Sequence, residues 1–162
     1  MEVRAARPEE YEEAGQIVRL AYAEFARPGE TSWERYLDEL ADVAGRAGRT
    51  LVLVAVEDGR VIGSVTLELE GRVDPDEPPL RPDEAHVRML AVHPAHRRRG
   101  VARALMAACE EEARRRGRRL LTLHTTQRMR AAQRMYEALG FERGPDRVFE
   151  DGFVLLSYSK RL

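Results

Sequence analysis

The sequence has very few cysteines, lysines and tryptophans, with one of each among its 162 residues, and it has no long apolar run. Because Cys109 is the single cysteine, no disulfide can form within the chain, and its helical apolar pattern favours a core residue over a nucleophile. No window approaches the roughly 18 continuous apolar residues of a membrane-spanning helix. The acidic N-terminal segment also lacks the apolar region of a secretory signal. These absences lead us to expect a cytoplasmic protein with no membrane partner.

A large excess of charge of one sign is also missing. The chain has 27 Lys and Arg residues against 28 Asp and Glu residues, for a formal net charge of −1. Proteins that bind nucleic acids are usually strongly basic or carry a series of stacking aromatic residues. We therefore expect no nucleic-acid partner. The length suits one domain over residues 1–162, with a core large enough to fold alone.

The apolar residues follow a pattern that changes period along the chain. It predicts, in order, a strand at 2–5, helices at 7–26 and 31–45, strands at 50–56 and 61–71, an acidic loop at 71–84, a strand at 85–93, a helix at 100–116, a strand at 118–125, a helix at 128–140 and two final strands. The central strand–helix–strand unit needs a crossover and so implies a parallel pair. This order predicts a mixed α/β (α+β) fold, with a mostly antiparallel sheet of about seven strands and helices on both faces.

One basic stretch lies between a predicted strand and a predicted helix. In "AHRRRGVARALM", the arginines at 97–99 run into Gly100 and an apolar helical pattern. The first turn of a helix has unpaired N–H groups and the positive end of the helix dipole, which together attract anions. Glycine lets a ligand approach the backbone closely. The stretch contains neither a P-loop nor a GxGxxG motif, and a basic first turn that faces solvent is the alternative interpretation.

Two blocks of sequence resemble the GNAT superfamily, the GCN5-related N-acetyltransferases. The segment "MLAVHPAHRRRGVARALM" is similar to motif A, whose signature [Q/R]-x-x-G-x-[G/A] is matched by Arg97–Ala102. "AAQRMYEALGF" resembles the later block A-x-x-x-Y-E-x-x-G-F, and the resemblance covers nearly the whole chain. It implies the GNAT fold, in which two central parallel strands, here 85–93 and 119–125, splay apart around acetyl-CoA.

The resemblance also implies which residues bind acetyl-CoA. The backbone of Leu90, Ala91 and Val92 would pair with the pantetheine arm, and an N–H near Leu90 would polarise the thioester carbonyl. The N–H groups from about Arg98 to Arg103 would hold the pyrophosphate, and the arginine side chains would add a positive electrostatic potential. Met129 replaces an asparagine that is frequent in the family, and it could pack against the pantetheine. The implied cofactor-binding residues are Leu90, Ala91, Val92, Arg97, Arg98, Arg99, Gly100, Val101, Ala102, Arg103, Met129 and Ala132.

The same resemblance assigns proton-transfer roles, and it implies no metal. Tyr136 matches the family tyrosine that protonates the leaving thiolate. His86 stands where many members have the glutamate that acts as general base, and Glu84 and Glu68 are further candidates. His124, at the end of the next strand, is a weaker candidate for lining the cleft.

These features predict an acetyl-CoA-dependent N-acetyltransferase that moves an acetyl group to a primary amine by direct attack. The alternative is a non-catalytic GNAT-fold protein that binds and senses acyl-CoA. The acceptor, a small-molecule or peptide amine, would meet residues 25–36 and 144–153. The acidic loop 71–84, with Glu68 and Glu70, could attract a cationic amine. A homodimer is possible, since dimers are frequent in the family.

Overall fold

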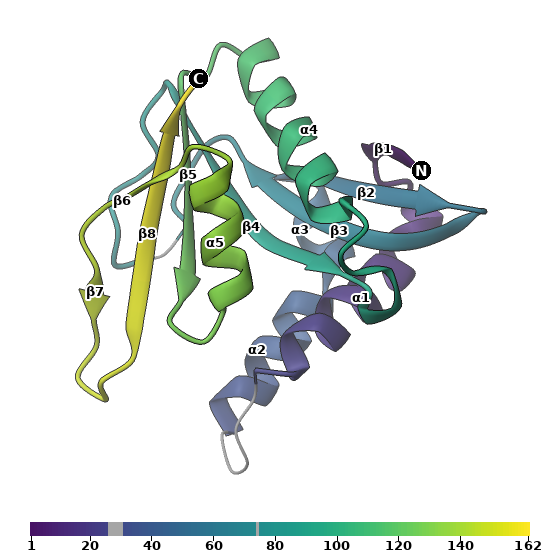
Figure 1. The fold of residues 1–162 in the computed structure, drawn as a ribbon, viewed down its shortest axis with the longest axis horizontal. Helices are drawn as coiled ribbons and strands as arrows, with labels where there is room; N and C mark the ends of the chain where they lie inside the picture. Colours follow the sequence, from purple (N-terminus) through teal and green to yellow (C-terminus); the bar gives the residue numbers. More distant parts are fainter. Residues whose placement is uncertain (26–30, 74) are drawn as a thin grey trace.

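A computed structural model describes residues 1–25, 31–73 and 75–162 of the chain. Within these residues an eight-stranded sheet has the order β1-β2-β3-β4-β5-β8-β6, and β7 pairs with β8 (Figure 1). The strands are β1 Glu2–Ala5, β2 Leu51–Glu57, β3 Arg60–Glu68, β4 Glu84–Val92, β5 Leu120–Thr126, β6 Glu142–Arg143, β7 Arg147–Val148 and β8 Val154–Arg161. Among the described pairs, β4 and β5 run parallel and the others run antiparallel.

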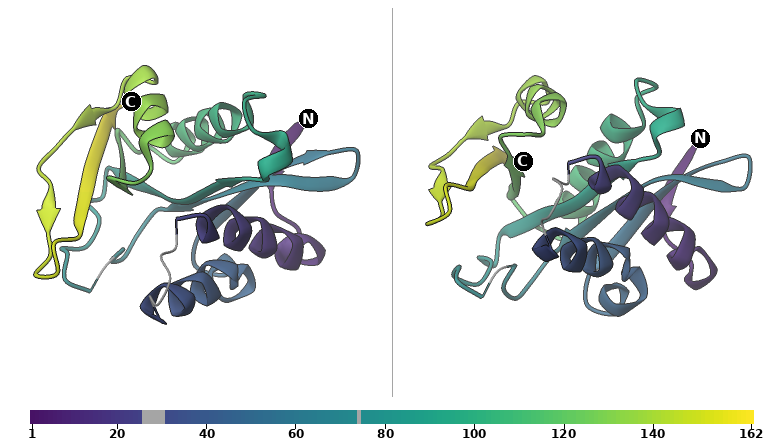
Figure 2. Two further views of the ribbon diagram at one scale, coloured as in Figure 1. Left: turned by 60° about the horizontal axis from the view of Figure 1, so that its bottom comes forward. Right: turned by 90° about the horizontal axis from the view of Figure 1, so that it is seen from below.

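Helices cover both faces of the sheet, as the sequence predicts (Figure 2). They are α1 Tyr11–Ala23, α2 Thr31–Ala41, α3 Val43–Ala47, α4 Val101–Arg115 and α5 Arg130–Ala138, with 3-10 turns at Pro8–Glu10 and Pro94–His96. The helices α1 to α3 pack on one face around a buried cluster that includes Val18 and Leu40. On the other face α4 and α5 contribute Leu105, Met106 and Tyr136 to a second buried cluster.

The predicted fold class is confirmed, with two differences in detail. The sheet has eight strands rather than about seven, because the C-terminal segment forms two short strands, β6 and β7, that each pair with β8. The predicted helix 31–45 is two helices, since Asp42 ends one and caps the next: its side chain accepts a hydrogen bond of 3.0 Å from the Gly45 N–H. Neither difference changes the order of the central elements.

A small residue on β3 sets how closely α4 approaches the sheet. A Cβ atom at Gly63 would lie 3.0 Å from side-chain atoms of both Val101 and Leu105 on α4. Since real Cβ contacts are rarely so short, glycine is needed for this packing. The first turn of α4 is therefore held tightly against the sheet, next to the end of β4.

The parallel strands β4 and β5 pair along only part of their length. Their register joins Glu84–Val87 to Leu120–Leu123 and then stops. Beyond this point β4 continues with β3 as far as Val92, and β5 continues with β8 as far as Thr126. A register shift on β4 accompanies the divergence, and Met89 adopts a positive φ of 57° there. This confirms the splayed central pair.

Candidate functional site

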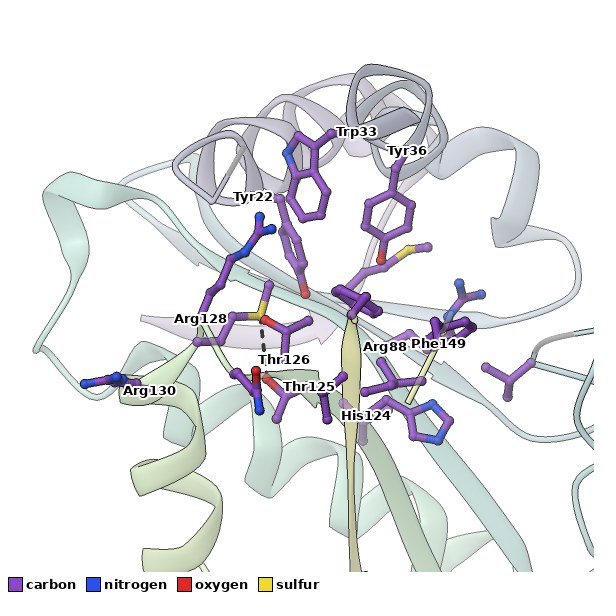
Figure 3. A pocket seen from close by; sticks show the side chains of 18 of the residues that line it. Tyr22, Trp33, Tyr36, Arg88, His124, Thr125, Thr126, Arg128, Arg130 and Phe149 are labelled. Carbon is purple, nitrogen blue, oxygen red and sulfur yellow. Dashed lines mark hydrogen bonds between the residues drawn. The ribbon is translucent and has the colours of Figure 1, made fainter. Parts of the chain in front are cut away.

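A cleft of about 920 Å³ lies where β4 and β5 part (Figure 3). Its walls come from the two splayed strands, the loop after β5, the aromatic residues of α1 and α2, and the turn before β8. The residues that line it include His86, Arg88, Met89, His124, Thr125, Thr126, Arg128 and Met129. The sheet therefore opens into the cleft between its two central strands.

Three aromatic side chains cover the cleft from the helices α1 and α2. Tyr22 and Tyr36 are arranged edge to face with ring centroids 6.4 Å apart, and Trp33 lies 5.5 Å from Tyr36 (Figure 3). Periodicity places Trp33 and Tyr36 on the core-facing stripe of a helix, but both line the cleft. These rings give this end of the cleft an aromatic wall, which suits an apolar part of a bound molecule.

His86 and Glu84, the first two candidates for the general base, both contact Thr122 on β5. His86 Nδ1 lies 2.8 Å from Thr122 Oγ1, and the Thr122 hydroxyl donates a hydrogen bond of 2.8 Å to Glu84 Oε2. The residues meet because β4 and β5 pair in register there, with His86 opposite Thr122. Thr122 was not identified from the sequence, because its only signal was the alternation of the strand.

Burial changes the acid–base properties of His86. The side chain is 3% exposed. Burial, followed by the nearby His124 and Arg88, lowers the pKa of His86 from 6.5 to about 3. The sequence suggests an imidazole with an ordinary pKa, whereas the folded chain holds it neutral at physiological pH.

Glu68, the third candidate, is engaged in an ion pair. Its Oε1 accepts a hydrogen bond of 3.0 Å from Nη1 of Arg88, and Glu68 is 7% exposed. A hydrogen bond between a guanidinium and a carboxylate is charge-assisted and therefore stronger than one between neutral groups. Glu68 therefore holds Arg88 at the cleft wall.

Tyr136 on α5 lies in the core behind the cleft. Its ring packs edge to face against Phe141 at 5.9 Å and lies 6.0 Å from Tyr158. The side chain is 6% exposed, and burial, followed by the neighbouring Cys109, raises the pKa of its phenol. Tyr136 therefore stays protonated at neutral pH.

The start of α4 has the geometry of an anion site. Gly100 is the N-cap residue, with a left-handed φ of 79°, and Arg98 has a φ of 62°. The first helical hydrogen bond to Gly100 is made by the Ala104 N–H, so the N–H groups of residues 101–103 precede the regular ladder. These N–H groups can turn toward a phosphate.

Two of the neighbouring arginines are already paired. Arg97 Nη1 lies 2.9 Å from Glu24 Oε2, and Arg99 Nη2 lies 3.1 Å from Glu57 Oε2. These contacts fasten the arginine loop to the end of α1 and to β2. In the described part of the chain, Arg98 makes no side-chain ion pair and is the arginine of the run most available to an anion.

The comparisons with known proteins decide the family. The family model for the Acetyltransferase (GNAT) family matches residues 14–141. The chain belongs to this family. No curated protein matches the chain in sequence.

Solved structures of GNAT acetyltransferases share this fold at low sequence identity. The yncA protein of Salmonella typhimurium, solved with acetyl-CoA, has a TM-score of 0.74 and 23% identity, over 100% of this chain and 94% of that chain. The ribosomal-protein-alanine N-acetyltransferase of Brucella melitensis has a TM-score of 0.72 and 24% identity, over 100% of both chains. The PaiA N-acetyltransferase of Thermoplasma acidophilum, solved with coenzyme A, has a TM-score of 0.74 and 17% identity, over 99% of this chain and 98% of that chain.

The other residues expected to contact the cofactor lie around the GNAT splay. Leu90 is half-buried, whereas Ala91 and Val92 pair with Ser64 and Gly63 on β3. Since the pairing of β4 with β5 stops at Val87, the opposite edge of this stretch has no strand partner among the described residues.

Two expected contacts lie on the α5 side of the splay. Met129 lines the cleft at the N-cap of α5, and its Sδ accepts a hydrogen bond of 3.5 Å from Thr125 Oγ1. Ala132 is half-buried against the core and does not line the cleft. Met129 is thus placed to touch a molecule in the cleft, and Ala132 lies one turn further along the helix.

The acidic loop reaches the far end of the cleft. Glu77 Oε1 lies 3.2 Å from Arg147 Nη1 and 3.5 Å from His124 Nε2. The Arg147 guanidinium is 4.5 Å from the centre of the Phe149 ring. Glu77 of the acidic loop is therefore paired with Arg147 and in contact with His124. Of the expected acceptor-binding segment 25–36, residues 26–30 lie outside the described residues.

Two further properties follow from the helices and side-chain clusters. None of the helices in the described part of the chain is long and apolar enough to cross a membrane. Across residues 1–25, 31–73 and 75–162, no cluster of three or more His, Cys, Asp or Glu side chains is arranged to hold a metal ion.

Proposed function

We propose that the protein transfers the acetyl group of acetyl-CoA to a primary amine bound in the cleft. The observation that carries this proposal is the edge of β4 from Arg88 to Val92, which has no strand partner among the described residues. A 3-10 turn and the arginine loop connect it to the left-handed Gly100 at the start of α4. An extended ligand with amide groups could add to this edge as a strand does. Its phosphates would then reach the N–H groups of α4.

The residues present fit acetyl-CoA. The backbone of Leu90, Ala91 and Val92 would hold the pantetheine, and the N–H groups at residues 98–103 would hold the pyrophosphate. Arg98 supplies positive charge that no carboxylate among the described residues neutralises through an ion pair. Met129 would pack beside the pantetheine arm. The relatives solved with acetyl-CoA and coenzyme A support this assignment.

Two side chains would move protons in the reaction. When bound, acetyl-CoA supplies a thioester whose carbonyl carbon forms a bond to the amine nitrogen as the carbon–sulfur bond breaks. His86, on the cleft floor, would accept a proton from the amine. The Tyr136 hydroxyl would return a proton to the leaving sulfur. A phenol that stays protonated until the sulfur becomes basic is suited to that role.

Sensing of acyl-CoA without catalysis is the second candidate function. It is favoured by one observation: burial shifts the pKa of both proton-transfer groups, His86 and Tyr136, away from neutrality. A protein that only binds acyl-CoA would tolerate these shifts. The arrangement of His86 with Thr122 and Glu84 favours the enzyme, since a simple binding protein has no need of it.

Binding and turnover can be measured separately. We expect CoA and acetyl-CoA to raise the melting temperature, because a ligand that binds only the folded state stabilises it. We then test acetyl-CoA with a panel of five amine acceptors: a peptide with a free N-terminus, lysine, spermidine, an amino-acid amide and an aminoglycoside. We expect at least one of them to give release of free thiol. A thermal shift without thiol release across the panel would favour the sensor. No thermal shift with CoA would reject both functions.

A further inference from the structure

A chain of three side chains crosses from β4 to β5 under the cleft. Thr122 Oγ1 lies at its centre, 2.8 Å from His86 Nδ1, 2.8 Å from Glu84 Oε2 and 3.4 Å from the carbonyl oxygen of Ala85. Glu84 is itself held by the backbone, since its Oε1 accepts a hydrogen bond of 3.2 Å from the Arg81 N–H. The Glu84 carboxylate, the Thr122 hydroxyl and the His86 imidazole therefore form a continuous hydrogen-bonded chain.

The hydrogen-bonding capacity of these groups determines where the protons lie. A threonine hydroxyl has one proton to donate, while a carboxylate and a carbonyl oxygen can only accept. Thr122 must therefore donate to Glu84 or to Ala85, and it has no proton left for His86. The short contact to His86 then requires an Nδ1–H donor. It follows that the neutral His86 has its proton on Nδ1 and a lone pair on Nε2.

We propose that Thr122 is a positioning residue that links His86 to Glu84 and relays the proton of the acceptor amine to that carboxylate. This inference rests on the proposed acetyl transfer and extends it. The amine would give a proton to His86 Nε2 while Nδ1–H passes its proton to Thr122 Oγ1. Thr122 would pass its own hydroxyl proton to Glu84 Oε2. One proton thus moves from the amine to Glu84, and the imidazole changes tautomer without becoming charged.

The surroundings of His86 explain why passing the proton on to Glu84 is more favourable than leaving a positively charged imidazolium at His86. On its own strand Arg88 is a nearby cation, and on β5 the His124 ring centre lies 4.8 Å away. Glu68 on β3 pairs in register with His86, but its carboxylate is committed to Arg88. On the loop side Glu77 contacts His124. A protonated His86 would be buried beside Arg88, whereas the carboxylate of Glu84 can take the proton.

The tautomer can be observed without any acceptor. In the full chain labelled with ¹⁵N-histidine, we expect His86 to show a protonated Nδ1 and an unprotonated Nε2 at neutral pH. Thr122→Val removes the hydroxyl at nearly constant volume and should abolish this preference, whereas Thr122→Ser should keep it. A wild-type His86 with its proton on Nε2 would overturn the proposal.

Kinetics test the relay itself, using the panel amine with the highest turnover. We expect Thr122→Val to lower kcat by about tenfold and Thr122→Ser by less than about twofold, with KM for acetyl-CoA unchanged in both. Glu84→Gln should lower kcat similarly, and the double variant should be no slower than either single variant, because both break one chain. Additive losses, or full activity of folded Thr122→Val, would reject the relay while leaving acetyl transfer intact. If the proposed acetyl transfer itself were wrong, the wild-type protein would release no thiol. That outcome is distinguishable from a failure of the relay alone.

Discussion

The two halves of β4 have opposite surroundings. Residues Glu84–Val87 pair with β5 and, at His86 and Val87, with β3 as well, whereas Arg88, Ala91 and Val92 pair with β3 alone among the described residues. The fully paired half brings His86 into register with Thr122 and fixes side chains. The half-paired stretch leaves main-chain donors and acceptors along an open edge. A strand edge inside a sheet leaves backbone N–H and C=O groups without partners, which is unfavourable. We therefore propose that residues 88–92 bind a ligand and that residues 84–87 take part in proton transfer.

The first test of this division is Tyr136→Phe, for which we expect the largest effect. Removing one hydroxyl from the buried ring would delete the proton donor and preserve the packing against Phe141 and Tyr158. We expect kcat to fall by about a hundredfold, while the Kd for CoA from calorimetry changes by less than about twofold. An equal loss of turnover and CoA affinity would mean that Tyr136 supports the ligand-binding half instead.

The start of α4, where the proposed pyrophosphate site adjoins the second half of β4, is tested next by Gly100→Val. Gly100 has a φ of 79°, and a Cβ there would meet no atom within 4 Å. The substitution therefore costs about 1–2 kcal/mol from backbone strain alone, and it also blocks the approach of a phosphate to the helix start. We expect CoA to bind at least about tenfold more weakly, whereas alanine at Arg97, Arg98 or Arg99 should each have a smaller effect.

A matched control is available at the other end of α4. Gly117 has a φ of 75° and equally open surroundings, but it lies far along the chain from the anion site. Gly117→Val should therefore lose similar stability and keep its affinity for CoA. If both glycine variants bind CoA equally, backbone access at Gly100 is not what this segment provides.

The third prediction concerns stability in the fully paired half. The pKa of His86 is about 3 in the folded chain, against 6.5 for a free imidazole. Between these values the unfolded state binds one more proton than the folded state. The stability conferred by a neutral His86 is thus fully present above pH 6.5 and is lost as the pH falls.

The pH dependence of unfolding by urea measures this effect. From pH 6 to pH 4.5, we expect the wild-type free energy of unfolding to fall by up to about 1.4 kcal/mol per pH unit more than that of His86→Gln. Parallel curves for the wild type and His86→Gln would show that His86 is solvated and able to titrate normally.

Much of the fold could be predicted because its signals are local. Alternation gave the central strands, and the turn "EDG" at 57–59 marks the hairpin between β2 and β3. The short strands β6 and β7 could not be predicted, since two residues carry no period. The break at Asp42 was missed because the apolar face continues through it.

The candidate site divides in the same way. Gly100 and Tyr136 could be predicted as site residues because they belong to motifs that resemble a known family, and their roles stay predictions. Thr122 and Arg88 were not found, because their positions matter only through partners on neighbouring strands. The pKa of His86 was also unpredictable, since it depends on burial by segments far away in the sequence. Local patterns therefore identify single residues, but the interactions between strands need the structure.

The smallest expected effect comes from Met129→Asn, in the loop between β5 and α5. Met129 is the N-cap of α5 and makes no side-chain cap. Asparagine is a favourable N-cap, so the variant should gain about 1 kcal/mol in the free energy of unfolding. If Met129 also faces the pantetheine, the new amide should add a hydrogen bond and tighten CoA binding by a few-fold. Calorimetry with CoA and urea unfolding without it measure the two gains separately. Greater stability with unchanged affinity would mean that residue 129 caps the helix and does not contact CoA, and that the ligand depends on the β4 side of the splay alone.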